Sequence, residues 1–220
     1  MQYKAVIFDL DGTLIDSLAD IAESVNEMLV HYGYPIHPVE AYRLMVGNGS
    51  HELIVRCMPE GTDAARIDEG VTYYKKIYEN RFLEKTRSYE GILDLLKELV
   101  LRGIPLAICT NKPTGAAHTI VEVLFEKDTF IEVVGDEPGQ PRKPDPKKVL
   151  KIADQMGILP QEIVYIGDSQ VDMQTAVNAK MLPVGVLWGF RDKDELEEHG
   201  AAVLLNRPLE LVEKITFQEN

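Results

Sequence analysis

The sequence is poor in cysteine and has no long uncharged hydrophobic run. Cys57 and Cys109 lie far apart, without a CxxC pair or a histidine spaced to complete a zinc site, so both are interpreted as buried thiols. No stretch approaches the roughly 18 uncharged apolar residues of a membrane span. The N-terminus MQYKAVIFDL lacks the long apolar region of a signal peptide. We therefore expect a protein of the reducing cytoplasm.

Positive charge is also scarce. The chain has 23 Lys and Arg against 36 Asp and Glu, a formal net charge of −13. Such a balance disfavours a sequence-independent grip on nucleic acid or on an anionic membrane, because both need surplus Lys and Arg. We expect a small-molecule partner instead, bound by either a monomer or a dimer. If that molecule carries phosphate, the protein must build a local positive site from a metal ion, lysine or backbone amides.

The hydrophobic pattern alternates between short β-branched runs and segments of helical periodicity. This alternation predicts βαβ units, and hence an α/β, Rossmann-like core with a mainly parallel sheet. The expected strands are Lys4–Phe8, Ile104–Thr110, Phe130–Val134, Ile163–Gly167 and Val184–Trp188.

The interval between the first and second expected strands is far longer than an ordinary crossover. Its first part has apolar residues at helical spacing from Leu18 to Tyr32, with Asp16 or Ser17 as N-cap and Gly33 just past the end. Further helices are expected at Val39–Met45, Ser50–Met58 and Ala64–Phe82. The sequence therefore predicts an all-helical cap domain over residues 17–84, inserted into a core of residues 1–16 and 85–220.

The first strand ends in a D-x-D-G-T sequence. Residues two apart in an extended chain project to the same side, so the carboxylates of Asp9 and Asp11 are expected in one region. A cation on one and a proton on the other would separate their pKa values and their roles. Gly12 permits a sharp turn, and Thr13 can bond to nearby backbone. Taken alone, the motif could also be an ordinary turn.

Polar residues follow the later strands as well. Asp168 comes directly after the fourth strand and Asp172 lies one helical turn further on, while Lys143 precedes a proline in a stiff loop. Thr110 and Asn111 end the second strand. Asp168 or Ser169 could instead cap the next helix, and each signal is weak singly. Because ligands of an open parallel sheet bind beyond the carboxyl ends of its strands, their coincidence predicts an oxygen-rich Mg²⁺ site.

Together, the residues at the strand ends form four ordered motifs that span nearly the whole predicted core. The motifs are Asp9-x-Asp11-Gly12-Thr13, Thr110-Asn111, Lys143-Pro144 and Gly167-Asp168-x-x-x-Asp172. They resemble those of the haloacid dehalogenase superfamily. The helical insertion directly after the first motif is similar to the cap of its phosphoglycolate phosphatase-like branch. This resemblance implies a three-layer core with strand order 3-2-1-4-5.

The resemblance also implies a phosphatase reaction. Asp9 would be the nucleophile that forms an aspartyl phosphate, and Asp11 the general acid for the leaving oxygen and then the base for water. Family members that displace halide from carbon have no alkoxide to protonate, so Asp11 points to phosphoryl chemistry. The expected enzyme is thus a hydrolase of a small phosphorylated metabolite, and the resemblance implies 2-phosphoglycolate as its substrate.

The ligand sets follow from the same resemblance. Mg²⁺ would be held by the Asp9 carboxylate, the Asp11 backbone carbonyl and Asp168, with Asp172 in support. The phosphoryl oxygens would be bound by the remaining motif residues, Thr110, Asn111 and Lys143.

Within the expected cap, Gly47-Asn48-Gly49 resembles the substrate-facing loop of phosphoglycolate phosphatases, although the glycines could simply shape a turn. Amides at the following helix N-terminus could face a substrate carboxylate. Three alternatives remain open: a pyrophosphatase, an enzyme similar to β-phosphoglucomutase, and a non-catalytic protein phosphorylated like a receiver domain.

Overall fold

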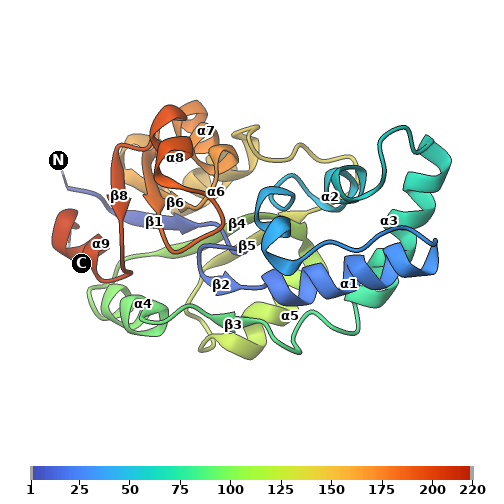
Figure 1. Cartoon of the computed structure of the whole chain (residues 1–220). Coiled ribbons are helices and arrows are strands. Elements are labelled where there is room, and N and C mark those ends of the chain that lie inside the picture. Colours follow the sequence, from blue (N-terminus) through green and yellow to red (C-terminus); the bar gives the residue numbers. More distant parts are fainter. Residues whose placement is uncertain (1, 219–220) are drawn as a thin grey trace.

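The chain forms a six-stranded parallel sheet with helices on both faces (Figure 1). The computed structural model describes residues 2–218. In spatial order the strands are β5 (Glu132–Asp136), β4 (Leu106–Pro113), β1 (Ala5–Phe8), β6 (Ile163–Gly167), β7 (Leu182–Val186) and β8 (Val203–Leu205). The first five stand in the predicted order 3-2-1-4-5, and β8 extends the sheet past them.

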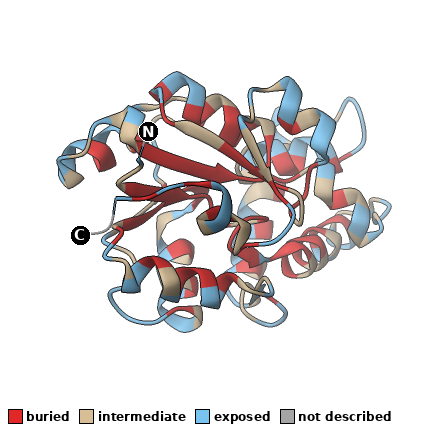
Figure 2. Ribbon diagram, turned by 90° about the vertical axis from the view of Figure 1, so that its left-hand side faces the viewer, coloured by how far each residue is buried: buried red, intermediate tan, exposed pale blue. Residues whose placement is uncertain are grey.

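Alternation along β1 divides the core into two layers. Val6 and Phe8 pack into one cluster, whereas Ala5 and Ile7 face the other. Figure 2 shows the buried strands between helices whose outer faces are exposed. The first cluster is covered by α4 (Ile92–Leu101), α5 (Thr114–Leu124) and α9 (Glu210–Lys214). The second is covered by α6 (Lys147–Met156) and α7 (Gln170–Ala179). This part of the chain also contains two short helices, a 3-10 helix at Pro160–Glu162 and α8 (Lys193–Glu198).

Residues 17–84, here called the helical insertion, form helices with a hydrophobic cluster of their own. The helices are α1 (Leu18–His31), a 3-10 helix (Val39–Leu44), α2 (Ser50–Cys57) and α3 (Ala64–Tyr78). They lie between β2 (Ile15–Asp16) and β3 (Arg87–Ser88), which pair antiparallel. The division into a core of 1–16 and 85–220 and a cap of 17–84 stays a prediction, and its boundaries fall at or beside this pair.

Several element ends differ from the sequence prediction. The second strand begins at Leu106 and continues to Pro113, because β5 pairs with it as far as Pro113. The fifth strand lies two residues earlier than predicted, and Trp188 has left the sheet to donate its indole N–H to the Thr13 carbonyl oxygen at 3.0 Å. Helix α3 ends at Tyr78 rather than at Phe82.

Both cysteines are free, buried thiols, as predicted. Burial raises the pKa of Cys57 and of Cys109 to about 12. Over residues 2–218, no helix combines the length and apolarity needed to cross a membrane.

Candidate active site

Three buried carboxylates gather at the carboxyl ends of adjacent strands. Asp9 follows β1, Asp168 follows β6, and Asp172 lies in the first turn of α7. One oxygen from each can be chosen so that all lie within 4.8 Å of one another. The parallel pairing of β1 with β6 explains the convergence of Asp9 and Asp168, because it brings the ends of both strands to one edge.

Lys143 lies within this cluster. Its ammonium nitrogen is 2.7 Å from Asp9 Oδ1 and 2.7 Å from Asp172 Oδ1. Asp172 is held in turn by Ser169, whose backbone N–H and hydroxyl donate to Asp172 Oδ2 at 3.1 and 2.6 Å. Burial acts against the charge on Lys143, but Asp172 and Asp9 outweigh it and raise the pKa of Lys143 above its usual value.

The cluster carries more negative charge than Lys143 balances. Burial, and then the charge of Asp172, raise the pKa of Asp9 to about 7 and that of Asp168 well above its usual range. Asp9 Oδ1 is paired with the Lys143 ammonium, which Asp9 shares with Asp172. An all-oxygen donor set of three buried carboxylates around one ammonium group fits a hard divalent cation such as Mg²⁺.

Glycines leave space for the Asp168 side chain. Gly12 has φ +84°, and a Cβ placed on it would lie 2.1 Å from Asp168 Oδ2. A Cβ on Gly189 would lie 2.3 Å from Asp168 Cβ. The backbone N–H of Phe190 donates to Asp168 Oδ2 at 2.7 Å. The Asp168 carboxylate is therefore fixed from two sides by backbone.

Asp11 makes contacts different from those of the cluster. Its Oδ1 accepts hydrogen bonds from the Ser17 hydroxyl at 2.5 Å and from Lys112 Nζ at 2.9 Å. Its carboxylate does not belong to the group of Asp9, Asp168 and Asp172 found among the described residues. Coordination of a metal by its backbone carbonyl, which the resemblance implies, stays a prediction. Ser17 precedes α1 as predicted, but its hydroxyl bonds Asp11 rather than the helix backbone.

Thr110 and Asn111 are buried in the carboxyl-terminal half of β4. Thr110 Oγ1 accepts from the backbone N–H of Lys112 at 3.1 Å. The Asn111 amide group donates to the Gly47 carbonyl oxygen at 3.1 Å and accepts from the backbone N–H of Lys143 at 3.0 Å. Asn111 thus connects the helical insertion to the loop that carries Lys143.

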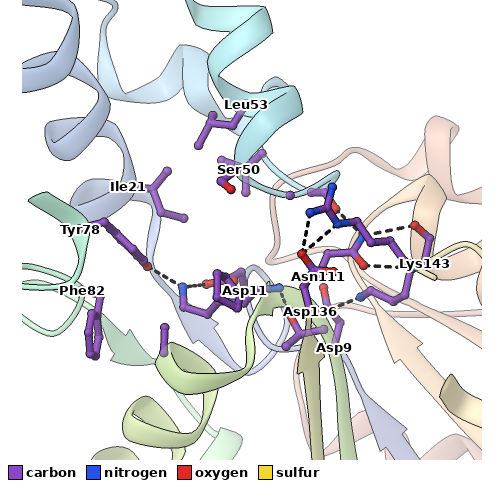
Figure 3. Close-up of a pocket in the computed structure, with 18 of the residues that line it drawn as sticks. Asp9, Asp11, Ile21, Ser50, Leu53, Tyr78, Phe82, Asn111, Asp136 and Lys143 are labelled. Atoms are coloured by element: carbon purple, nitrogen blue, oxygen red, sulfur yellow. Dashed lines mark hydrogen bonds and ion pairs between the residues drawn. The ribbon is translucent and has the colours of Figure 1, made fainter. Parts of the chain in front are cut away.

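A cavity of about 570 Å³ lies between these residues and the helical insertion. Figure 3 shows Asp9, Asp11, Asn111 and Lys143 on one side of it. Its apolar wall is formed by Ile21, Val46, Leu53, Tyr74, Tyr78 and Phe82.

Of the predicted loop, Gly47 and Gly49 line the cavity. Asn48 is not among the lining residues, and its side-chain oxygen accepts from Arg56 Nη2 at 3.0 Å.

Sequence reasoning placed Lys112 at the end of the second strand but gave it no role; it is buried and bonded to both Asp11 and the Tyr78 hydroxyl. Arg191, for which the sequence suggested only a place at the border of the substrate mouth, lines the cavity, and its Nη2 donates to the Val46 carbonyl oxygen at 2.8 Å. The position of Arg191 depends on tertiary contacts with the helical insertion, for which the sequence has no local signal.

The fold and this site define a class of hydrolases. The family model of haloacid dehalogenase-like hydrolases matches residues 6–186, and the chain belongs to that family.

Similar proteins place the chain in a narrower group within this family. A phosphoglycolate phosphatase of Psychrobacter arcticus is 34% identical over 90% of this chain and 89% of its own length. One of Pseudomonas putida is 31% identical over 92% of this chain and 76% of its own length. The crystal structure of a proposed phosphoglycolate phosphatase from Lactobacillus delbrueckii subsp. bulgaricus, 32% identical, superposes with a TM-score of 0.93 over 99% of this chain and 100% of that one. The chain therefore lies in the phosphoglycolate phosphatase-like branch, among phosphoric monoester hydrolases.

Proposed function

We propose that this protein is a Mg²⁺-dependent phosphatase that hydrolyses a small phosphate monoester through a phosphate on Asp9. The observation that carries the proposal is the convergence of Asp9, Asp168, Asp172 and Lys143, with Asp11 two residues from Asp9. The names of the relatives make 2-phosphoglycolate, which would yield glycolate and phosphate, the first substrate to test.

In the first step a carboxylate oxygen of Asp9 attacks phosphorus and the bond from phosphorus to the ester oxygen breaks. Asp11 gives its proton to the leaving oxygen, so the product leaves as an alcohol. In the second step Asp11 takes a proton from water as that water attacks phosphorus. The bond between phosphorus and the Asp9 oxygen then breaks and releases inorganic phosphate.

The phosphoryl oxygens are assigned to Thr110, Asn111 and Lys143. All three residues are buried, and all line the cavity next to Asp9. The contacts of Asn111 with the Gly47 carbonyl and the Lys143 backbone limit its motion before substrate binds. Such preorganised donors stabilise charge without reorganising during the reaction.

Mg²⁺ is assigned to the Asp9 and Asp168 carboxylates and the Asp11 backbone carbonyl, with Asp172 in support. When bound, the ion would offset charge on the phosphoryl oxygens. The convergence of Asp9, Asp168 and Asp172 around a single lysine and the raised pKa of Asp168 support this assignment.

The helical insertion, residues 17–84, is assigned as a cap over the core of residues 1–16 and 85–220. Its separate hydrophobic cluster and its position over the cavity support this role. The loop Gly47-Asn48-Gly49 would face the leaving group through its backbone, because the Asn48 side chain is bonded to Arg56. Closure of such a cap excludes water from the reacting phosphate.

Asp9→Asn tests the nucleophile. We expect kcat for 2-phosphoglycolate and for a panel of other phosphate esters to fall at least about 10³-fold, because the reaction loses its covalent step. Asp154→Asn, an exposed change on α6, serves as the matched control and should keep wild-type activity. Dialysis against a chelator should abolish turnover, and added Mg²⁺ should restore it.

Full activity of the metal-free enzyme would contradict the assigned metal site. Asp11→Asn should slow turnover, and a variant that keeps full turnover would favour the receiver-like alternative. Burst kinetics with transfer of phosphate to a sugar phosphate would identify a mutase instead.

A further inference from the structure

The buried side chain of Lys112 lies between Asp11 and the helical insertion. Its ammonium nitrogen donates to Asp11 Oδ1 at 2.9 Å and also to the hydroxyl of Tyr78, at the end of α3. The nitrogen lies 4.8 Å from the centroid of the Tyr78 ring. Lys112 is 6% exposed and lines the cavity. It therefore contacts the residue assigned to the leaving oxygen and faces the space assigned to the leaving group.

Lys112 has a donor to spare. An ammonium group has three N–H donors. Asp11 and Tyr78 use two of them, and no further oxygen or nitrogen acceptor for Lys112 Nζ is found within residues 2–218. One donor therefore remains for a ligand in the cavity, and using it does not break either existing contact.

Of the four other cations that line the cavity, three are paired with carboxylates, and the fourth, Lys75, is exposed. Lys143 lies between the carboxylates of Asp9 and Asp172, and Arg142 is paired with Asp136 at 2.7 Å. Arg191 is paired with Glu195 at 3.3 Å, and its Nη1, although it lacks an acceptor, is sealed from solvent.

We propose that Lys112 recognises an anionic group on the leaving group of the substrate, one or two bonds from the leaving oxygen. The inference rests on the proposed phosphatase function and narrows its substrate class. Asp11 must reach the leaving oxygen within hydrogen-bond distance to protonate it. Lys112 Nζ, at 2.9 Å from Asp11 Oδ1, is then close to whatever the leaving oxygen carries.

Two anions have this placement. One is the carboxylate of 2-phosphoglycolate, two bonds from the ester oxygen, and the other is the second phosphate of pyrophosphate. A neutral alcohol such as a sugar hydroxyl offers the spare donor only an uncharged acceptor, which binds an ammonium group more weakly than an anion does. The same lysine therefore favours both anionic substrates over the hexose phosphates of a mutase.

Kinetics with matched substrates test this role. Ethyl phosphate has the two-carbon chain of 2-phosphoglycolate without its charge, and pyrophosphate provides the second anionic arm. For the wild type we expect kcat/KM for one anionic substrate to exceed that for ethyl phosphate at least about 10-fold. Whichever of 2-phosphoglycolate and pyrophosphate has the higher kcat/KM shows whether Lys112 recognises a carboxylate or a phosphate.

In Lys112→Met the ratio of kcat/KM values, anionic substrate over ethyl phosphate, should fall about 10- to 100-fold, as expected for loss of a hydrogen bond to a charged group. Lys112→Arg keeps the charge and should recover part of the ratio. Lys76→Met, an exposed change on the same helix as Tyr78, controls for loss of a positive charge and should leave the ratio unchanged. A merely structural role of Lys112 would lower kcat/KM for both substrates equally, and that result overturns the proposal, as does a wild-type preference for ethyl phosphate.

Binding separates this inference from the proposed function. In an Asp9→Asn background, 2-phosphoglycolate, pyrophosphate and ethyl phosphate can be titrated by calorimetry with Mg²⁺ present, whether or not any of them is hydrolysed. Lys112→Met in that background should weaken binding of an anionic ligand relative to ethyl phosphate about 10- to 100-fold. Equal affinities for all three ligands would overturn the role of Lys112, whereas absent turnover of every ester by the wild type would overturn the phosphatase. Circular dichroism establishes that each variant is folded.

Discussion

At the scale of single residues, the position of Asp168 depends on residues that have no side chain. Gly12 and Gly189 approach it from separate loops, and a Cβ on either would lie within 2.3 Å of an Asp168 atom. A Cβ on Gly12 would meet the Asp168 carboxylate, which the Phe190 N–H holds, and a Cβ on Gly189 would also meet the Gly12 carbonyl oxygen at 2.5 Å. The metal ligand proposed for this site is therefore positioned by close backbone approach.

Gly12→Ala should displace Asp168. The substitution places a Cβ 2.1 Å from Asp168 Oδ2 at a residue with φ +84°. A misplacement of about 1 Å at a reacting site can cost about 10²-fold in rate, so we expect kcat to fall at least that much and the apparent affinity for Mg²⁺ to weaken. Steady-state kinetics over a Mg²⁺ titration measures both effects.

Gly33→Ala is the matched control for Gly12→Ala. Gly33 has φ +72°, so alanine meets similar backbone strain there, but nothing lies within 4 Å of the added Cβ. We expect a stability loss of about 1 kcal/mol and wild-type kinetics. Equal activity of the two variants would show that Asp168 tolerates displacement.

At the scale of elements, one buried carboxylate joins α1 to the segment that returns to the sheet. Asp20 is fully buried and accepts from the backbone N–H groups of Lys85 and Thr86 at 3.0 and 2.9 Å. The Thr86 hydroxyl donates to Asp20 Oδ2 at 2.7 Å. Because Asp20 accepts from three donors, it holds together the two chain segments that connect the helical insertion to the core, beside the pair of β2 and β3.

Asp20→Ala should destabilise the protein by about 3 kcal/mol, because it leaves buried N–H groups without an acceptor. Glu23→Ala is the control. It removes an ion pair to Lys85 in the same segment, but both side chains are at least 36% exposed, so we expect a loss within about 1 kcal/mol. Denaturant unfolding measures the two free energies, and a similar loss in both variants would contradict this account of Asp20.

The sequence predicted elements well where their patterns were long. Strand β6 has its predicted bounds, and the helices of the insertion were expected where they occur. Three strands gave no usable signal, because β2 and β3 have two residues each and β8 has three. Such short segments show no alternation, and tertiary pairing decides their structure.

For the candidate site, the sequence placed the strand-end residues together because parallel strands deliver their ends to one edge. It did not predict that Asp11 would be shared by Ser17 and Lys112, since that depends on side-chain directions across separate elements. The roles of these residues remain predictions.

At the scale of the whole molecule, two arginines link the helical insertion to the loop after β7. One belongs to the insertion and the other to the loop, and each donates to backbone carbonyl oxygens of the other segment. Arg43 in the insertion donates to the carbonyl oxygens of Gly189 and Phe190. Arg191 beyond β7 donates to the carbonyl oxygens of Leu44 and Val46, at 3.3 and 2.8 Å. Gly189 also packs against Asp168, so this linkage connects the position of the insertion to the carboxylate cluster.

Arg43→Ala should therefore shift the protein toward an open arrangement. We expect faster hydrogen exchange in residues 39–49 and in the two segments that join the insertion to the core, 14–17 and 84–90, which would act as its hinges, because fewer contacts hold the insertion against the core. KM for the best substrate should rise several-fold, since part of the binding energy is then used to close the insertion. Orthovanadate, as a phosphate analogue, should restore much of the exchange protection if it binds the closed arrangement better.

The control for Arg43→Ala is Arg66→Ala, which removes an exposed ion pair with Glu69 on α3 and a contact with the ring of Tyr32 just after α1. Mass spectrometry of deuterium uptake should show wild-type exchange in that variant outside α3 and the end of α1. If Arg43→Ala exchanges like the wild type at both hinges, or if orthovanadate changes neither protein, the insertion does not move as a cap. Because activity is not part of this readout, the result tests the motion of residues 17–84 independently of the substrate.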